Sequence, residues 1–549
     1  MSSAVEPLRY RRFRSLWAAN VLSASGSFIQ TVAGSWLMLE MTGSSTWVGL
    51  MVASPLLPLF FLSLAAGALA DMFDRTKLML IAQGIMGGSA AAMSLLTYLD
   101  VMTPGILLGL GLVLGAGLAL NIPAWQALVP DLVPRGLVAS AVALQSAAFN
   151  AARAVGPAIG GFILVAYGAA AGFGINAVTY LVVIAALLVI GSQLAGPEPE
   201  RKSMGSAITQ GLRYARFTPA FRNLIALVSL FALTSSVVQA VLPVHTVALG
   251  GDEATYGLLL GGMGAGALIG AVMRQRLLSR LTSSSVPYTI TAFGVSAVIL
   301  GVAPNAVVAF VVMLAIGFFW LLTLTTLNAS AQLMAPGWIR GRAMSLYTLA
   351  FAGLLPIGSI LSGIVADWVG TTGAIVGFAS GTLALGLLSP RFGVPAIHEI
   401  ETPEFSARMS TPHERYRSLE GGPVIVLNTW KVNEDDLAEF AAVMNEVRMI
   451  RLTTGAYRWR LFRDTADPTR LTELFAVESW EEHLAQHGRV DDASIEMMAR
   501  ARSFDTADGP KSRHLIAVDV EDPPDFDAMI AAHEAMHRGD AAIRLDRDG

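Results

Sequence analysis

The chain has 549 residues, of which 54% are hydrophobic and 14% are charged, and this composition is too apolar for an ordinary soluble domain. Residues 1–391 carry 19 Lys and Arg against 11 Asp and Glu, whereas residues 392–549 carry 18 against 30, so the two parts have net charges of +8 and −12. The chain has no cysteine, which excludes a disulfide framework and thiol chemistry.

Twelve apolar segments precede residue 391, and each is long enough to cross a bilayer as a helix, which takes about 20 residues. They are expected near 13–39, 46–70, 78–99, 104–128, 137–166, 170–194, 222–248, 254–277, 286–303, 306–334, 342–366 and 372–390. The first segment contains Asn20 and Gln30 and lacks a small-residue cleavage site, so we expect it to be a retained helix rather than a signal peptide.

The basic residues test this count, because cytoplasmic loops are enriched in Lys and Arg. All loop Lys and Arg fall on one side of the expected topology, among them Arg75 and Arg340. The charged residues of the opposite loops are all acids, such as Asp100 and Asp367. We therefore expect a multi-pass protein of the inner (plasma) membrane with both termini in the cytoplasm.

The first six expected spans resemble the last six. With a shift of 208 residues and no gap, residues 13–50 match residues 221–258 at ten of 38 positions. A second match, at a shift of 205 or 206, surrounds Arg135 and Arg340. Such a repeat predicts two parallel six-helix bundles with the ligand site between them near the midplane.

The chain is accordingly divided into six parts. These are an N-terminal six-helix bundle (1–195), a cytoplasmic central loop (196–221), a C-terminal six-helix bundle (222–391), a linker (392–420), a soluble domain (421–520) and an acidic tail (521–549). In the soluble domain, the pattern predicts a strand, a helix, a strand hairpin, further helices and a last strand, which is the order of a ferredoxin-like β-α-β-β-α-β unit. The tail string HEAMH fits a zinc-helix pattern but lacks a third ligand, so no metal site is expected.

The loop after the second span reads GALADMFDRTK and contains Gly67, Asp71 and Arg75. It resembles the loop signature of the major facilitator superfamily, in which such residues form a charged latch. Asp131, at the cytoplasmic end of the fourth span, is a candidate further member. An ordinary basic loop with helix caps accounts for the cations of this segment but poorly for Asp71.

The fifth span carries ARAVGPAIGG, in which Gly156, Pro157, Gly160 and Gly161 match the export signature of that superfamily and Ala152 replaces an expected glycine. Small residues allow close helix packing and the proline bends the span, so packing alone is an alternative explanation. The strings WLMLEMTGSSTWVGL and ALQSAAFNAARAVGPAIGG look like the enterobactin-exporter branch of drug and siderophore exporters. This resemblance, over residues 9–391, implies proton-driven export of a small hydrophobic or amphiphilic molecule by alternating access. An importer on the same fold remains open.

Polar residues within the spans are candidates for the substrate cavity. Arg153 is the only Lys or Arg away from the ends of an expected span, and buried charge in a membrane favours a function. The full candidate set is Asn20, Gln30, Asn121, Gln145, Asn150, Arg153, Gln239, Asn328 and Gln332. Helix-to-helix hydrogen bonding explains several of these equally well. Glu40 and His245 are the candidate proton sites, since no Asp or Glu lies deep in a span.

The string FAVESWEEHLAQHGR resembles the dimeric antibiotic-biosynthesis-monooxygenase domains. That resemblance implies Asn428, Trp480 and His487 as the counterparts of functional positions. We expect a dimerising or regulatory module, with an active oxygenase as the alternative, and a transporter rather than an enzyme overall. The expected partners are a small-molecule substrate, the lipid bilayer, protons and a second copy of the chain; no catalytic residue, cofactor, metal or nucleic acid is expected.

Overall fold

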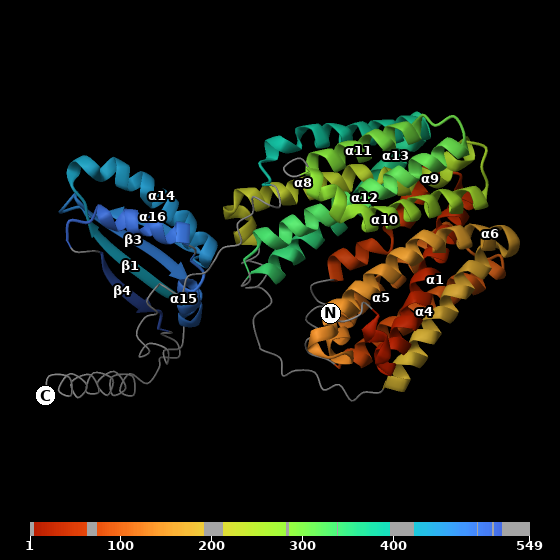
Figure 1. Ribbon diagram of the computed structural model, residues 1–549, viewed down its shortest axis with the longest axis horizontal. Helices are drawn as coiled ribbons and strands as arrows, with labels where there is room; N and C mark the ends of the chain where they lie inside the picture. The colour runs from red at the N-terminus through yellow and green to blue at the C-terminus, as the bar shows by residue number, and fades with distance from the viewer. Residues whose placement is uncertain are drawn as a thin grey trace. The chain divides into compact units, whose positions relative to one another are not determined.

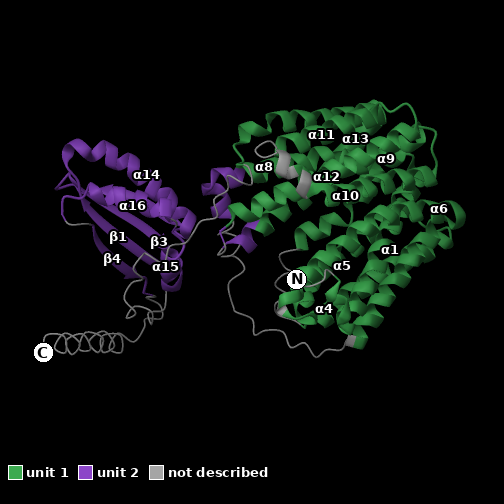
Figure 2. Ribbon diagram, in the orientation of Figure 1, with its two compact units in different colours: residues 1–204, 223–335, 344–400 green, residues 205–222, 336–343, 401–549 purple. Residues whose placement is uncertain are grey.

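The structure is a computed structural model, which describes residues 5–62, 74–190, 212–281, 285–336, 339–395, 422–490, 492–507 and 510–518. It divides into two compact units (Figure 2). The first comprises residues 1–204, 223–335 and 344–400, and the second comprises residues 205–222, 336–343 and 401–549. Long helices make up the first unit, whereas the second contains a β-sheet with helices (Figure 1).

The helices of the first unit follow the apolar segments of the sequence. Before residue 191 they are α1 (Arg11–Thr42), α2 (Ser45–Ala53), α4 (Arg75–Tyr98), α5 (Pro104–Leu132) and α6 (Val138–Ile190). After residue 218 they are α8 (Pro219–Ser235), α9 (Val237–Ala248), α10 (Glu253–Leu281), α11 (Ser285–Gly301), α12 (Ala306–Met334) and α13 (Arg340–Leu388). Short 3-10 helices are η1 (Glu6–Arg9), η2 (Arg135–Leu137) and η4 (Ser389–Phe392).

Polar side chains set the starts of several helices. The Asp74 carboxylate accepts a hydrogen bond from the Lys77 amide at 3.0 Å, and the Asn305 side chain accepts one from the Val308 amide at 3.0 Å. The first amides of a helix lack partners inside the helix, so a short oxygen-bearing side chain just before it stabilises that end. As a result, α12 begins where the sequence predicts, at residue 306; it also ends at the expected residue, 334.

Two helices contain a sharp change of direction. In α6, Gly168 has a φ of 75°, and in α13, Gly370 has a φ of 81°, which are backbone conformations that glycine adopts without strain. Each of these helices therefore covers two of the expected spans. Within the described residues, eight helical stretches are long and apolar enough to cross a membrane.

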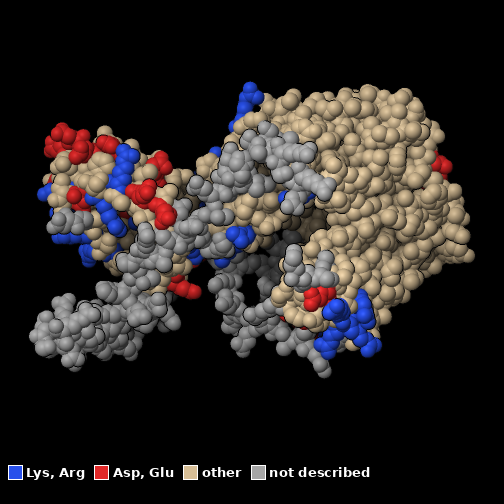
Figure 3. Space-filling model, viewed as in Figure 1, with Lys and Arg blue, Asp and Glu red and all other residues tan. Residues whose placement is uncertain are grey.

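The surface of the first unit separates charge from apolar residues. In Figure 3, the visible Lys and Arg of this unit lie near the ends of its helices, and the broad lateral surface carries almost no charged residue. Large apolar side chains of this unit such as Phe162, Leu188 and Val272 are exposed, by 58%, 65% and 83%. An exposed apolar belt of this kind fits contact with lipid rather than water.

Contacts within the first unit fall into two sets of helices. In the N-terminal set, α1 packs against α6 and α4 packs against α5; in the C-terminal set, α12 packs against α10 and α11. The main contacts between the sets join α6 to α10 and α2 to α9. The two sets are therefore each packed internally and meet along a few helices (Figure 1).

The second unit contains a four-stranded antiparallel sheet. Its elements are β1 (Val424–Lys431), η6 (Glu434–Asp436), α14 (Leu437–Thr454), β2 (Arg458–Arg463), β3 (Arg470–Val477), α15 (Trp480–His487), α16 (Asp492–Ser503) and β4 (Lys511–Ile516). The strand order is β2-β3-β1-β4, and all neighbouring strands are antiparallel. Thus the strands and helices occur in the order that the sequence predicts.

One face of this sheet packs against helices. Along β1, burial alternates with period two, which places Val424, Val426, Asn428 and Trp430 on the covered face. Trp430 packs with Phe440 of α14 and belongs to a core that also includes residues of α16. A polar side chain on this covered face is buried, so it needs a hydrogen-bond partner within the domain.

Candidate functional site

Two of the residues expected in the loop latch, Arg75 and Asp131, pair with each other. Arg75, the first residue of α4, forms an ion pair with Asp131 near the end of α5, with Nη1 and Oδ2 separated by 2.7 Å. This contact ties two helices of the N-terminal set together at one end. Gly67 and Asp71 lie outside the described residues.

Several candidate cavity residues pair with one another inside the N-terminal set. The Gln30 side chain is only 7% exposed, accepts a hydrogen bond from Asn176 Nδ2 at 2.5 Å and approaches Met93 sulfur. Gln83 donates to Asn121 at 3.0 Å. The structure thus uses Gln30 and Asn121 for contacts between helices, and Gln30 does not line an open face of α1.

The remaining polar candidates are less deeply placed. Asn20, Gln145 and Gln239 are half-buried, and Gln145 Oε1 is a buried atom without a partner among the described residues. Asn150 donates to the Ser146 carbonyl of its own helix at 2.8 Å, and Gln332 donates to Asn328 at 2.7 Å. These residues are distributed over α1, α6, α9 and α12 rather than joined in one network.

Arg153 lies in α6 beside a pair of aromatic rings that contact each other. Its guanidinium carbon is 5.3 Å from the ring centroid of Phe149 and 6.0 Å from that of Phe28 on α1, and the two rings are 5.5 Å apart. Such cation–π contacts stabilise a desolvated guanidinium by up to about 2 kcal/mol. None of the ion pairs among the described residues involves Arg153.

Of the export-signature residues, Pro157 and Gly161 lie where α6 meets α10, whereas Gly156 and Gly160 face α1. A Cβ placed on Gly257 would be 2.7 Å from both the Gly161 Cα and the Pro157 carbonyl oxygen. One built on Gly160 would lie 3.0 Å from the Cα of Ile29 on α1, and one on Gly156 would lie 2.7 Å from Phe28 Cβ. The two sets of helices therefore approach through backbone atoms on α6, a distance that a larger side chain would not allow.

The two proton-site candidates have different surroundings. Glu40, near the end of α1, is exposed and accepts a hydrogen bond from Trp36 Nε1 at 2.9 Å. His245 is buried: its Nδ1 lies 3.2 Å from Thr371 Oγ1 and its Nε2 lies 3.1 Å from the Leu300 carbonyl oxygen. His245 thus links α9 to α11 and α13, whereas Glu40 remains open to solvent or headgroups.

Asp367 of α13 binds the start of α2, which belongs to the other set of helices. Its carboxylate accepts hydrogen bonds from the Ser45 amide at 2.7 Å and from the Thr46 amide at 3.1 Å. The hydroxyls of Ser44 and Thr46 donate to it at 2.7 Å and 2.6 Å. A single carboxylate therefore caps a helix of the N-terminal set from the C-terminal set.

The covered sheet face of the second unit holds a buried carboxylate. Glu473 of β3 is fully buried and accepts hydrogen bonds from Asn428 at 2.7 Å, from Trp459 at 2.9 Å and from Arg451 Nε at 3.3 Å. Burial of a charge is tolerated when it is paired and hydrogen-bonded in this way. Neither Glu473 nor Arg451 was predicted from the sequence, although Glu473 has the inward phase of Leu471 and Phe475 in the period-two pattern of β3.

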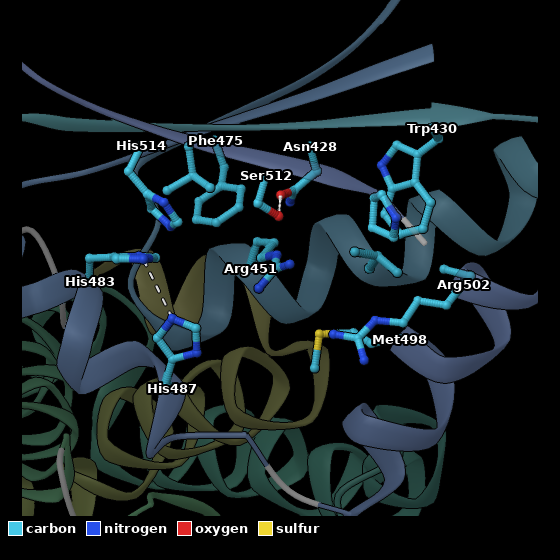
Figure 4. A pocket seen from close by; sticks show the side chains of 14 residues that line it. Asn428, Trp430, Arg451, Phe475, His483, His487, Met498, Arg502, Ser512 and His514 are labelled. Carbon is cyan, nitrogen blue, oxygen red and sulfur yellow. Dashed lines mark hydrogen bonds between the residues drawn. The ribbon is translucent and has the colours of Figure 1, made fainter. Parts of the chain in front are cut away.

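Of the three residues implied by the oxygenase resemblance, Asn428 and His487 line one cavity, together with His483 and His514 (Figure 4). Trp480 packs edge-on against His514, with ring centroids 5.6 Å apart. Burial, followed by nearby positive groups including Arg451, lowers the pKa of His483 to about 3 and that of His487 to about 4. Both imidazoles are therefore neutral at pH 7.

Comparisons with known proteins agree with the helical part of the structure. The multidrug efflux pump Tap of Mycobacterium tuberculosis (strain H37Rv) is 24% identical over 408 residues, which cover 70% of this chain and 93% of that protein. The Staphyloferrin A transporter of Staphylococcus aureus is 26% identical, with 64% of this chain and 89% of the relative covered. The enterobactin exporter EntS of Salmonella typhimurium is 27% identical, with 61% and 81% covered.

Solved structures show the same fold. A bacterial homologue of the human lysosomal transporter Spinster, in an inward-facing and unoccupied conformation, aligns with a TM-score of 0.59 at 14% identity, covering 70% of this chain and 98% of that one. A D-xylose–proton symporter aligns with a TM-score of 0.57 at 15% identity, covering 72% and 100%. The fold is thus that of a helical membrane transporter.

A family model described as transmembrane secretion effector matches residues 2–522. That range includes all the helices of the first unit and all the strands of the second. The protein therefore belongs to the transmembrane secretion effectors of the major facilitator superfamily, a family of multi-pass membrane transporters.

Proposed function

We propose that this protein is a secondary active exporter that moves a small amphiphilic molecule carrying an anionic group out of the cytoplasm. Its helices would form twelve spans in two six-helix repeats, with both termini in the cytoplasm of a cell whose inner membrane it crosses. Alternating access between the two sets of helices would carry the cargo. The observation that carries this proposal is Arg153, a cation inside a membrane span with aromatic side chains as its neighbours.

The surroundings of Arg153 favour an anionic cargo with an apolar part. A guanidinium within a bilayer costs several kcal/mol unless an anion or dipole faces it. Phe28 and Phe149 offer ring faces, which compensate part of that cost and supply an apolar surface for the same ligand. A carboxylate or sulfonate attached to an aromatic or aliphatic body matches both features.

The position of Arg153 also connects binding with movement. A Cβ at Gly264 of α10 would overlap the backbone of Ala154 and the Arg153 carbonyl, so this turn of α6 lies directly against the other set of helices. A ligand that draws the Arg153 side chain toward itself would act on the contact between α6 and α10, about which the two sets of helices would move. Binding energy would in this way favour one of the two conformations.

Export rather than import is supported by the Gly156, Pro157, Gly160 and Gly161 pattern and by the relatives named as an efflux pump and an exporter. Transport of anilinonaphthalene sulfonate, an anionic aromatic dye, into inverted and right-side-out membrane vesicles tests the direction. Energised uptake into inverted vesicles alone is expected. Uptake into right-side-out vesicles alone would establish the importer instead.

The role of Arg153 is tested in the same vesicles. Arg153→Gln is expected to lower the initial rate for the anionic dye by about tenfold or more, because a charge-assisted hydrogen bond is worth about 1.5–3 kcal/mol. Arg153→Lys should retain part of the rate. The matched control is Arg11→Gln, which removes an exposed cation at the start of α1. Equal rates in Arg153→Gln and Arg11→Gln would refute this role.

Coupling to protons forms part of the proposal and rests on Glu40 and His245. Glu40 is accessible and bonded to Trp36, whose ring stacks on Tyr256 of α10 with centroids 5.9 Å apart. A change of charge on Glu40 would therefore act next to a contact between the two sets of helices. At the other end, Arg75 and Asp131 would join Gly67 and Asp71 in the cytoplasmic latch.

For the second unit we propose a ferredoxin-like domain that serves as a dimerising or regulatory module. The sheet order β2-β3-β1-β4 supports this assignment. Phe462 and Leu515 are 49% and 44% exposed, and strand pairing places both on the sheet face opposite Glu473. Mass photometry of the full chain tests it: Phe462→Glu is expected to convert a dimer into a monomer, and a monomeric wild-type protein would refute a dimer interface.

A further inference from the structure

A cavity lies between the sheet and the helices of the second unit (Figure 4). Its volume is about 140 Å³. Its lining comes from β1, β3 and β4 on one side and from α14, α15 and α16 on the other. The proposed export assigns no role to these residues, so the cavity calls for an explanation of its own.

Three buried polar atoms around the cavity lack hydrogen-bond partners among the described residues. They are Trp430 Nε1, His483 Nδ1 and His487 Nδ1. Trp430 is 4% exposed and His483 is 2% exposed, so water reaches neither side chain freely. An unpaired buried donor or acceptor costs about 1–3 kcal/mol, and native proteins rarely leave several at one place. Their convergence on one cavity indicates a ligand with polar atoms.

The charges around the cavity select an anion. The guanidinium groups of Arg451 and of the exposed Arg502 both line it. Within the described residues, the one carboxylate paired with either is Glu473, at 3.3 Å from Arg451 Nε. With the histidines neutral, one positive charge is left without compensation. Guanidinium groups bind carboxylates strongly because the two are planar and their hydrogen bonds are parallel.

The walls and the size of the cavity select a single ring. Arg451 stacks over Phe475, with its guanidinium carbon 4.5 Å from the ring centroid. The centroid of the His483 imidazole is 6.3 Å from that of the Phe475 ring and 4.8 Å from that of the His514 imidazole. Val447 and Met498 complete an apolar wall. A protein cavity of about 150 Å³ holds a benzene molecule, so the space here fits one six-membered aromatic ring.

A metal ion fits this donor set poorly. His483 Nε2 and His487 Nε2 are 3.4 Å apart, but among the described residues no group of three His, Cys, Asp or Glu side chains has the geometry to hold a metal. Arg451 adds a positive charge close to both imidazoles. Two neutral imidazoles beside a guanidinium are better suited to a planar anion.

We propose that the second unit binds a monocyclic aromatic carboxylate in this cavity, with the carboxylate between Arg451 and Arg502 and the ring against Phe475 and the imidazoles. The chain would then bind a small anion outside its transport pathway. This binding goes beyond the export proposal and is tested without any measurement of transport.

The test is isothermal titration of benzoate into the purified full-length protein in detergent. The protein carries Arg153→Gln, because the proposed cargo site also favours an aromatic anion, and one saturable site per chain is then expected. Benzylamine has the ring with the opposite charge, benzamide has the ring without charge, and acetate has the carboxylate without the ring. Each of the three is expected to bind at least about tenfold more weakly than benzoate, since each lacks the charge or the ring contact.

Two variants locate the site. Arg502→Gln removes a charge from the rim, and Ala501→Leu fills the cavity while keeping every polar group; Ala501 is 1% exposed and lines it. Both are expected to weaken benzoate binding at least about tenfold. Arg500→Gln is the matched control, because Arg500 lies on the same helix and pairs with Glu439 at 2.9 Å, away from the cavity lining.

Arg451→Gln is a less suitable variant, because it would leave the buried Glu473 without its cation and destabilise the domain. The proposal is overturned by any of three results. These are the absence of saturable benzoate binding, equal binding of benzylamine, and the same loss of affinity in Arg500→Gln as in Arg502→Gln.

Discussion

The bond between Asp367 and the start of α2 predicts how the outer end of the transporter opens. Ser44, Ser45 and Thr46 direct four hydrogen bonds at this one carboxylate, two from amides and two from hydroxyls. In the proposed topology Asp367 lies on the outer side. Separation of the two sets of helices there must break all four bonds, so Asp367→Ala should favour the outward-open conformation.

The magnitude follows from the kind of contact. Loss of a capping side chain costs about 0.5–2 kcal/mol, and Asp367 is exposed, so the larger values for buried charge do not apply. A change of about 1–2 kcal/mol multiplies the ratio of outward-open to outward-closed molecules by about 5 to 30. Asp367→Asn retains one acceptor oxygen and should give a smaller shift.

Distance measurement between spin labels checks this expectation. The chain has no cysteine, so Tyr98→Cys and Val307→Cys provide one label on each set of helices, at positions that are 80% and 74% exposed. Asp367→Ala should add a population at longer distance. Asp100 is an exposed acid just after Tyr98, at the end of α4. Asp100→Asn therefore serves as the control for Asp367→Asn. A distance distribution that is the same in Asp367→Ala and in the parent protein would refute the reasoning.

Three further predictions concern other contacts. Gly257→Ala places a Cβ 2.7 Å from Gly161 and should lower dye transport at least about tenfold at normal membrane abundance; Gly84→Ala, where a Cβ meets no atom within 4 Å, should have no effect. Glu40→Gln should abolish substrate-driven proton flux measured with a pH-sensitive dye, and an unchanged flux removes Glu40 from coupling. The second unit should lose stability as pH falls from 6.5 toward 4. In that range the histidines of the unfolded chain take up protons, whereas His483 and His487 in the folded domain do not. Each histidine lowers the free energy of unfolding by about 1.4 kcal/mol per pH unit. Hydrogen-exchange protection factors of α15 in the full chain, corrected for intrinsic rates, should therefore fall over that range, and constant protection would contradict the assignment of neutral imidazoles.

The positions of the elements were largely predictable from local patterns. Long apolar runs with polar capping residues give α12 its bounds, and period-two alternation gives β1 its inward residues. These features depend on neighbours in the chain. The sequence therefore places helices and strands to within a few residues, without any knowledge of how they pack.

Pairs of residues that are distant in the chain were not predictable in the same way. Gln30 and Asn176 are 146 residues apart, and the Ser44 hydroxyl and Asp367 are 323 apart, so no local period connects them. Gln30 of α1 was expected to line the substrate cavity, yet it faces another helix. One polar side chain per turn has the same appearance in both cases, and only the packing partner distinguishes them.

The backbone contact between α6 and α10 has a consequence for how such transporters diversify. Because main-chain atoms of Pro157, Gly161 and Gly257 form it, it places no demand on the side chains elsewhere along the same helices. Residues that face the cargo can therefore be substituted while the contact between α6 and α10 keeps its dimensions. One fold can in this way acquire new substrate specificity through substitutions at a few inward positions, without disturbing the contact between its two sets of helices.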